Sequence, residues 1–247
     1  MSTPRLLALD TSTDQLSLAL LTPQGRFSHG EAGGAQASAA LLPSLQALLR
    51  SAGQAMAGPA AADGLQAIAF GRGPGAFTGL RTACAVAQGL GLGLDCPLLA
   101  IDSLLIVADD ARAQAQDQGL ATDGLWWAAV DARMDEVYAA PYEHSSQGWQ
   151  ALAEPALYTL SALAAAWQAA PPVRVAGNAS RVFAGRLPLG SAACWPEARD
   201  RAAALLRLAE AAWARGETLA ADVALPSYLR DKVALTTAER AAQALLK

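Results

Sequence analysis

The glycine-rich stretch from Gly71 to Gly79 constrains the fold of this chain more than any other segment. Four glycines in nine residues indicate left-handed backbone, or the very close approach of another group. An apolar run, Leu65 to Phe70, precedes the stretch, and the small-residue segment Phe77 to Leu94 follows it. We therefore predict a tight turn that joins a buried strand to a long helix.

The same stretch has competing functional interpretations. A P-loop needs a lysine directly after its last glycine, and Leu80 occupies that position. Residues 71–76 match the loose dinucleotide-binding fingerprint, but Pro74 removes a backbone donor from the loop. The nearest acid that closes a strand, Asp102, also lies farther along than the fingerprint requires. A structural turn that packs the helix against the sheet is the interpretation that we favour.

The rest of the chain alternates between strand-like and helix-like segments. Such alternation predicts an α/β fold whose sheet is covered on both faces. Ser103 is the predicted N-cap of the third helix. The segment 221–234 has no clear periodicity. The predicted strands are 5–10, 15–21, 26–32, 65–70, 97–102, 125–131, 136–142 and 173–176, and the predicted helices are 37–51, 77–94, 103–118 and 196–215.

The second half of the chain repeats a pattern of the first half. The run Leu125 to Asp131 ends in a carboxylate and is followed by a turn and a return strand, as the run ending at Asp10 is. About half of the 247-residue chain separates the two carboxylates. This spacing indicates internal duplication. Two unrelated hairpins are the alternative.

Composition excludes several classes of protein. A net charge of −4 and a pI near 5.2 leave no basic surface with which to hold a phosphate backbone unaided. No apolar run approaches the roughly 20 residues of a membrane helix, and the first residues do not resemble a signal peptide. We therefore expect a cytoplasmic protein that does not contact membranes.

Cysteine and histidine are sparse and widely spaced. Cys84, Cys96 and Cys194 form no close pair, which is typical of buried thiols in a reducing compartment. His29 and His144 belong to no helical metal-binding pattern. We predict neither a metal site nor a disulfide.

Two acidic turns are candidate sites. Asp10, Thr11 and Ser12 follow the first strand, and their carboxylate and hydroxyls suit a phosphate or a hydrated magnesium ion. An Asx or Ser/Thr turn that closes a hairpin is the favoured alternative. Asp131 begins a second acidic cluster, 131–136, which is a candidate general acid/base site or a solvated turn. No pattern of an activated nucleophile occurs in the chain.

Taken in order, five segments resemble the bacterial TsaB (YeaZ) family of tRNA threonylcarbamoyladenosine biosynthesis subunits. The resemblance implies the two-lobed actin-like ATPase fold, also called ASKHA or ribonuclease H-like, with two related βββαβα lobes. It places an N-terminal lobe with the partner and dimer interface at 1–118 and a C-terminal lobe at 119–247. The segments that carry the resemblance are Leu7–Thr13, Leu41–Pro43, Gly71–Arg81, Asp131–Tyr138 and Pro226–Arg230.

The resemblance implies a subunit without catalytic residues or metal. Such a subunit supports TsaD, which with TsaE transfers threonylcarbamoyl from its adenylate to the adenosine beside the anticodon of certain tRNAs. It reaches tRNA only through the complex, forms a homodimer in isolation and requires no cofactor, ATP or ADP being bound at the level of the complex. The alternative is an ATPase or small-molecule kinase that uses Asp10 and Asp131 to hold a magnesium nucleotide. A nicotinamide-dependent oxidoreductase is a third hypothesis, and it rests on the fingerprint alone.

In this family the first two helices form the partner interface, which corresponds here to Ala37–Ser51 and Phe77–Leu94. Alanine and glycine in the second helix permit the close approach of another helix, although helix faces buried inside one subunit have the same composition. The predicted interface residues are Leu41, Leu42, Leu45, Leu48, Leu49, Phe77, Thr78, Arg81, Cys84, Ala85 and Gln88.

Overall fold

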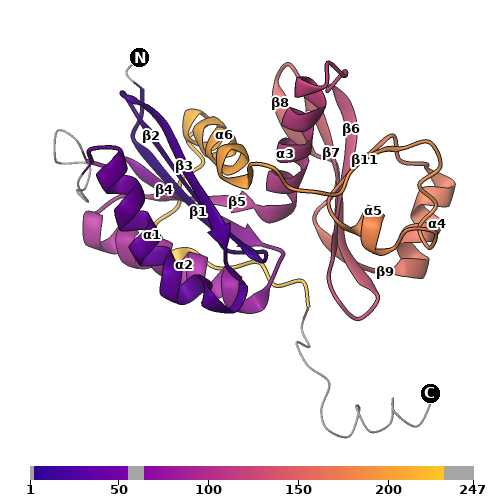
Figure 1. The fold of residues 1–247 in the computed structure, drawn as a ribbon, viewed down its shortest axis with the longest axis horizontal. Helices are drawn as coiled ribbons and strands as arrows, with labels where there is room; N and C mark the ends of the chain where they lie inside the picture. Colours follow the sequence, from indigo (N-terminus) through magenta and orange to yellow (C-terminus); the bar gives the residue numbers. More distant parts are fainter. Residues whose placement is uncertain (1–2, 55–63, 231–247) are drawn as a thin grey trace, which may run out of the picture.

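The chain folds into two lobes, each built around one sheet (Figure 1). The computed structural model describes residues 3–54 and 64–230. The first sheet has five strands in the order β3-β2-β1-β4-β5, and the second has six, ordered β11-β10-β6-β7-β8 with β9 paired to β7. Two mixed sheets with helices around them confirm the predicted α/β class.

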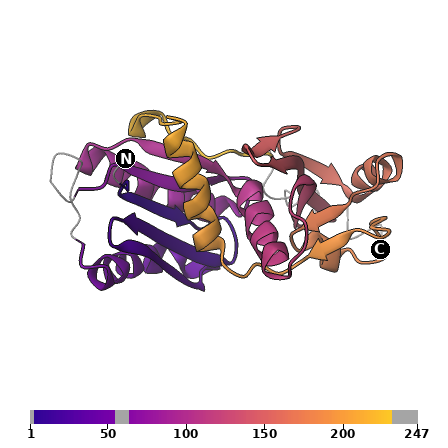
Figure 2. The ribbon, with the colours of Figure 1, turned by 90° about the horizontal axis from the view of Figure 1, so that it is seen from above.

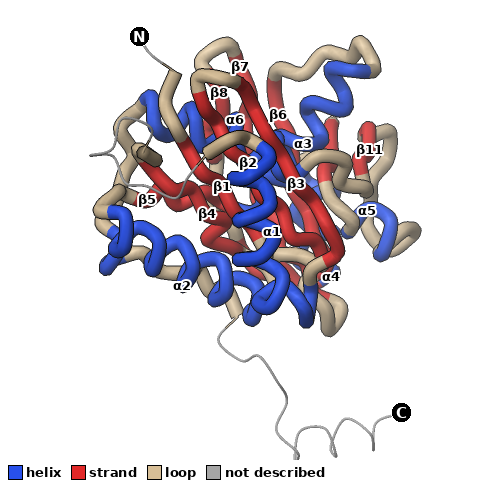
Figure 3. The backbone as a smooth tube through the Cα atoms, turned by 60° about the vertical axis from the view of Figure 1, so that its left-hand side comes forward, coloured by secondary structure: helices blue, strands red, loops and turns tan. Residues whose placement is uncertain are grey.

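In the first lobe, β1 lies at the centre of the sheet, antiparallel to β2 and parallel to β4. Helices α1 and α2 cover one face of this sheet, as Figures 1 and 3 show. The predicted bounds of both helices are confirmed. The elements are β1 (Leu6–Asp10), β2 (Gln15–Thr22), β3 (Gly25–Ala32), α1 (Ala37–Ser51), β4 (Ala67–Gly73), α2 (Phe77–Leu94), β5 (Leu98–Asp102) and α3 (Ser103–Asp117).

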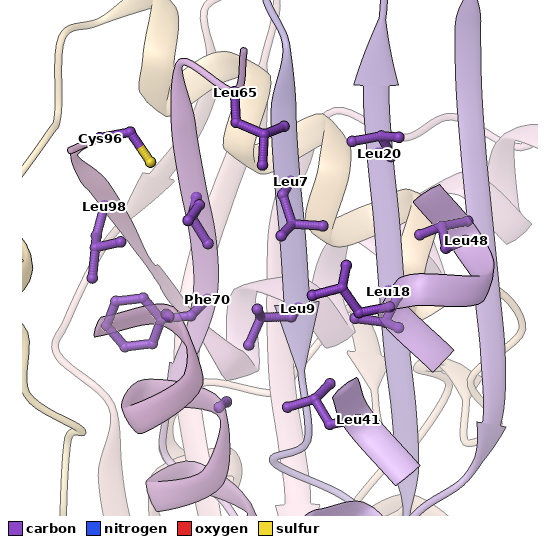
Figure 4. Close-up of a cluster of buried hydrophobic side chains, with 14 of the residues drawn as sticks. Leu7, Leu9, Leu18, Leu20, Leu41, Leu48, Leu65, Phe70, Cys96 and Leu98 are labelled. Carbon is purple, nitrogen blue, oxygen red and sulfur yellow. The ribbon is translucent and has the colours of Figure 1, made fainter. Parts of the chain in front are cut away.

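The core of the first lobe follows from the alternation of β1. Leu7 and Leu9 face α1 and α2, together with Phe70 of β4 (Figure 4). Leu6 and Ala8 point to the opposite face of the sheet. Because both faces are covered, every residue of β1 is buried. The carboxylate that ends this strand therefore lies deep in the protein.

The second lobe repeats the element order of the first, with the short strand β9 added. This repetition supports the predicted duplication. The sequence patterns did not indicate β8, β9, α4, α5 or β11. The elements are β6 (Gly124–Asp131), β7 (Glu136–Ser145), β8 (Gly148–Ala151), β9 (Ala156–Thr159), α4 (Leu160–Ala169), β10 (Arg174–Ala176), α5 (Ala179–Val182), β11 (Ala193–Trp195) and α6 (Arg201–Ala214).

Helix α6 leaves the second lobe and packs on the free face of the first sheet (Figure 2). Its residues Leu205 and Ala209 lie against Leu6 and Ala8. Helix α3 lies between the lobes and packs against the second sheet. The proposed division of the chain at residue 118 stays a prediction, and by its packing α6 belongs with the first sheet.

Two predicted helix starts are corrected. Helix α3 is capped by Asp102 rather than Ser103, because the Asp102 carboxylate accepts from the Leu104 amide at 2.8 Å. Helix α6 begins at Arg201 rather than Pro196, since Asp200 caps it through the Ala203 amide at 2.9 Å.

Beyond α6, a short 3-10 turn, Ala221–Val223, is followed by extended chain as far as Arg230. The last four residues of the segment 221–234 lie outside the described residues. No helix within 3–54 and 64–230 is long and apolar enough to cross a bilayer.

Candidate functional site

A cavity of about 870 Å³ lies between the lobes. The turn after β1 and the loop before α2 form its wall on the first lobe, and the end of β6 forms its wall on the second. Charged and polar side chains of both lobes line it. They include Ser12, Asp14, Asp110, Asp131, Arg133, Asn178, Arg181, Glu197, Arg201 and Arg230.

The predicted Asp10 turn lies beneath this cavity and is closed by an arginine. Asp10 is 0% exposed, and its Oδ2 atom accepts from Arg201 Nη2 at 2.7 Å and from Ser12 Oγ at 2.9 Å. The Oδ1 atom accepts from the Ser12 amide at 3.2 Å. Arg201 comes from α6, and its side chain is 3% exposed. A buried guanidinium therefore neutralises the carboxylate that was the candidate magnesium ligand.

The glycine-rich loop packs directly on this turn. A Cβ atom on Gly71 would lie 1.9 Å from Asp10 Oδ1, and one on Gly79 would lie 1.7 Å from the Thr11 carbonyl oxygen. Thr11 Oγ1 donates to the Gly79 carbonyl at 2.7 Å. The group that approaches these glycines is therefore the chain's own first turn, which confirms the structural-turn interpretation.

The middle of the loop makes the same kind of contact. A Cβ atom on Gly75 would lie 2.4 Å from the Ser12 carbonyl oxygen, and the Ala76 amide donates to that oxygen at 2.7 Å. The two candidate phosphate-binding loops thus fill each other's space.

A magnesium nucleotide does not fit the Asp10 turn as it stands. The Arg201 guanidinium lies against the Asp10 carboxylate, where it would repel a divalent cation. In the glycine-rich loop, the Ala76 amide already donates to the Ser12 carbonyl and is not free to bind a phosphate. Within the described ranges, no three His, Cys, Asp or Glu side chains are grouped so that they could hold a metal ion.

Asp131, the other candidate ligand, is not brought to the Asp10 carboxylate. Its side chain is 12% exposed and borders the cavity, and its Oδ1 atom accepts from the Arg133 amide at 2.8 Å. The Asp131 amide donates to Asn178 Oδ1 at 2.8 Å. One candidate carboxylate is therefore open to the cavity while the other is sealed.

The remaining acids of the second turn each have an arginine partner. Asp135 pairs with Arg186 at 2.9 Å, and this hydrogen bond holds the pKa of Asp135 below its usual value. Glu136 pairs with Arg230. Because the turn is paired in this way, its geometry favours an ion-paired turn over a general acid/base pair.

The predicted interface residues divide into two groups. Leu41, Leu45, Leu48, Leu49 and Cys84 are buried in the core of the first lobe, where Figure 4 shows Leu41 and Leu48. Burial also raises the pKa of the Cys84 thiol. These five side chains of α1 and α2 face their own sheet. Their contact with a partner stays a prediction.

The other predicted residues lie at the surface or under another segment. Phe77 and Gln88 are half-buried against residues 224–228, and Gln88 Nε2 donates to the Ala224 carbonyl at 2.9 Å. The exposed members are Leu42, Thr78, Arg81 and Ala85. Their contact with a partner stays a prediction.

The outward face of α2 carries little charge and is flanked by exposed leucines. Leu42 is 48% exposed and Leu92 is 65% exposed, and Arg81 is the only charged residue of α2. Exposed leucines beside a helix surface of small residues are typical of protein contact surfaces.

Sequence reasoning gave Arg201 no role, and it included Arg230 only as the end of a segment that carries the resemblance. Arg201 lies 191 residues from Asp10, so no local motif joins them. The sequence offered one signal for Arg201. It lies in a predicted helix rich in alanine and leucine, and a charged residue on the buried side of such a helix needs a partner.

Sequence comparison identifies relatives of this chain among known proteins. The family model for TsaD, tRNA N6-adenosine threonylcarbamoyltransferase, matches residues 29–186. The chain is 32% identical over 246 residues to the tRNA threonylcarbamoyladenosine biosynthesis protein TsaB of Escherichia coli, covering 93% of this chain and 96% of that protein. It is 38% identical over 133 residues to TsaB of Haemophilus influenzae, covering 54% of this chain and 51% of the relative.

A solved structure extends the likeness to three dimensions. The structure of YeaZ from Pseudomonas aeruginosa superposes with a TM-score of 0.78 at 39% identity, covering 92% of this chain and all of that one, 100%. Fold and site together define a two-lobed α/β protein of the actin-like class whose Asp10 turn is closed by its own arginine. Within that class, the chain belongs to the TsaB (YeaZ) family.

Proposed function

We propose that this chain is a non-catalytic subunit in tRNA threonylcarbamoyladenosine biosynthesis, and that it binds and supports a TsaD subunit acting with TsaE. In this proposal TsaD transfers threonylcarbamoyl to the adenosine beside the anticodon, and the chain contacts tRNA only as part of the complex. It requires no cofactor of its own, and ATP or ADP binds at the level of the complex. The chain works in the cytoplasm. Membership of the TsaB family supports the pathway.

The Asp10–Arg201 pair is the observation that carries the non-catalytic role. The magnesium-nucleotide alternative uses Asp10 as a ligand, and here the Asp10 carboxylate is buried and ion-paired with Arg201. The ATPase or kinase alternative loses its main ligand for this reason. The oxidoreductase alternative loses its dinucleotide loop, because Gly71 and Gly79 contact the chain's own backbone and Asp10.

The small, mostly uncharged residues on the outward face of α2 support partner binding. Ala85, Gly89 and Gly93 are exposed on α2 and leave its backbone accessible to another helix. The same face serves for the homodimer and for TsaD, so the two complexes compete for it. Leu42 and Leu92 flank this surface and supply apolar area.

The test is binding of purified TsaD to the wild-type chain and to an α2 variant. Ala85→Arg places a long cation on the proposed contact face, and we expect affinity for TsaD to fall by about a hundredfold or more. Val173→Arg is the matched control, because Val173 is 58% exposed on the second lobe. Light scattering of the chain alone reports the homodimer, which only Ala85→Arg disrupts. Failure of the wild-type chain to bind TsaD at micromolar concentration contradicts the proposal.

A further inference from the structure

The segment after α6 runs back along α2 before it reaches the second lobe (Figure 1). We call residues 221–230 the strap. At one end of α2, a Cβ atom on Gly91 would lie 2.9 Å from Ala221 Cβ. Farther along, the Ala224 carbonyl accepts from Gln88 Nε2 at 2.9 Å and from Cys84 Sγ at 3.6 Å. The strap therefore follows the flank of the proposed partner helix for most of its length.

The strap is fastened most firmly at the start of α2. The rings of Tyr228 and Phe77 lie 5.2 Å apart, and Arg81 Nε donates to the Tyr228 hydroxyl at 3.0 Å. The Arg81 guanidinium lies 3.8 Å from the centroid of the Phe77 ring, a cation–π contact. The Ser227 amide also donates to the Arg72 carbonyl at 2.6 Å. These contacts join the strap, the glycine-rich loop and α2.

The strap then crosses to the second lobe and ends on the β6–β7 turn. Arg230 Nη2 donates to the carbonyls of Ala132 at 2.9 Å and Arg133 at 3.3 Å, and it pairs with the Glu136 carboxylate. The Arg230 side chain is only 14% exposed. Arg230 Nη1 also donates to Met134 Sδ at 3.1 Å, so one guanidinium holds four acceptors of a turn that borders the cavity.

The turn that Arg230 holds has an uncommon backbone. Arg133, Met134 and Asp135 have φ values of 67°, 56° and 58°, a left-handed conformation that side-chain-bearing residues rarely adopt in succession. Bonds to the carbonyls of this turn are therefore needed to keep it in place. Arg186 also bonds to this turn, through the Asp135 carboxylate at 2.9 Å, and it lies within the second lobe.

We propose that the strap couples α2 to the β6–β7 turn, and that Arg230 is the residue that positions both. A protein bound on the outward face of α2 then also fixes the edge of the cavity on the other lobe. The link to partner binding rests on the proposed function, whereas the coupling within the chain does not. In Figure 1 the strap passes from beside α2 toward the second lobe.

Hydrogen exchange of the full chain tests the coupling. In Arg230→Met we expect exchange to accelerate, on the order of tenfold, in the turn 132–136 and also at the first turns of α2. Arg186→Met is the matched control, because it removes a bond to the same turn without touching the strap. Its effect should stay within 132–136. Acceleration confined to that turn in both variants, or no change at α2 in Arg230→Met, overturns the coupling.

Affinity for TsaD tests the consequence for partner binding. Arg230→Met should weaken the complex several-fold although Arg230 is not on the outward face of α2, and Arg186→Met should leave it unchanged. Equal affinities for the two variants and the wild-type chain overturn the link to the partner. If the wild-type chain fails to bind TsaD, the proposed function fails, and hydrogen exchange still decides whether the lobes are coupled.

Discussion

The two lobes share one topology, yet the carboxylates that end their first strands differ in burial and in ion pairing. Asp10 and Asp131 close the equivalent strands β1 and β6. Asp10 is fully buried beside Arg201, whereas the Asp131 side chain is partly exposed and borders the cavity. Equivalent positions in a repeated fold therefore do not keep equivalent chemistry.

The helix that follows each lobe explains the difference. Helix α6 follows the second lobe and packs on the first sheet, where it delivers Arg201 to Asp10. Helix α3 is its counterpart, and it faces the cavity with Val107, Asp110 and Ala111 rather than with a cation. Arg201 of α6 therefore closes the turn at Asp10, whereas α3 brings no arginine to the turn at Asp131, which stays open to the cavity.

The largest expected effect comes from breaking the Asp10–Arg201 pair. Arg201→Met leaves a buried carboxylate without its cationic partner, and we expect the free energy of unfolding to fall by about 3–5 kcal/mol. The double variant Asp10→Asn with Arg201→Met should recover most of that loss, because no unpaired charge remains. Urea denaturation measures both. A loss below about 1 kcal/mol in the single variant would mean that the pair behaves like an exposed one.

The next effect concerns the glycine-rich loop. Gly79→Ala places a Cβ atom 1.7 Å from the Thr11 carbonyl oxygen, so we expect a loss of about 1–3 kcal/mol or more. Gly89→Ala on the same helix is the control, because a Cβ atom there meets nothing within 4 Å. That change should stabilise the chain by about 0.5–1 kcal/mol. Equal stability of the two variants in thermal unfolding would show that the loop does not pack closely on the first turn.

Sequence reasoning predicted the elements whose patterns are local. Strands β1 and β2 are apolar runs bounded by turn residues, α1 has leucines at helical spacing, and α2 is a long run of small and apolar residues after a glycine-rich turn. Helix α4 was missed because its alanine-rich sequence, Leu160–Ala169, has no contrasting polar face, and β11 was missed because its three residues, Ala193–Trp195, contain no run of β-branched residues.

The site was predicted only in part, for a physical reason. Asp10 and the glycine-rich loop were recognised separately, but their mutual packing and the Arg201 pair depend on contacts far apart in sequence. The same holds for Arg230, which lies 98 residues from Ala132, the acceptor that it holds. Residues that act through long-range pairing leave little trace in a local pattern.

A smaller effect is expected at a third carboxylate that ends a strand, Asp102. Burial raises its pKa, while a hydrogen bond from the Tyr142 hydroxyl and the amide of Leu104 lower it. The folded chain therefore binds a proton more tightly than the unfolded chain does. Its contribution to stability is complete below the ordinary pKa of 3.8 and is lost as pH rises through the raised value.

Asp102→Asn should remove this decline, because the amide oxygen can still accept from the Leu104 amide and the amide NH2 can donate to the Tyr142 hydroxyl. We expect the unfolding free energy of the wild type to fall relative to that of the variant as the pH rises above 3.8. Denaturation curves at several pH values measure it. An identical pH dependence of stability for both proteins would show that burial does not raise the pKa of Asp102.

Titration of the isolated chain with magnesium ATP, followed by calorimetry, tests the central claim most directly. If the Asp10 turn is closed by Arg201, the chain without a partner gives only heats of dilution up to millimolar nucleotide. Saturable binding that disappears in Asp10→Asn would contradict the account, because it would show that Asp10 is a working ligand despite its buried arginine.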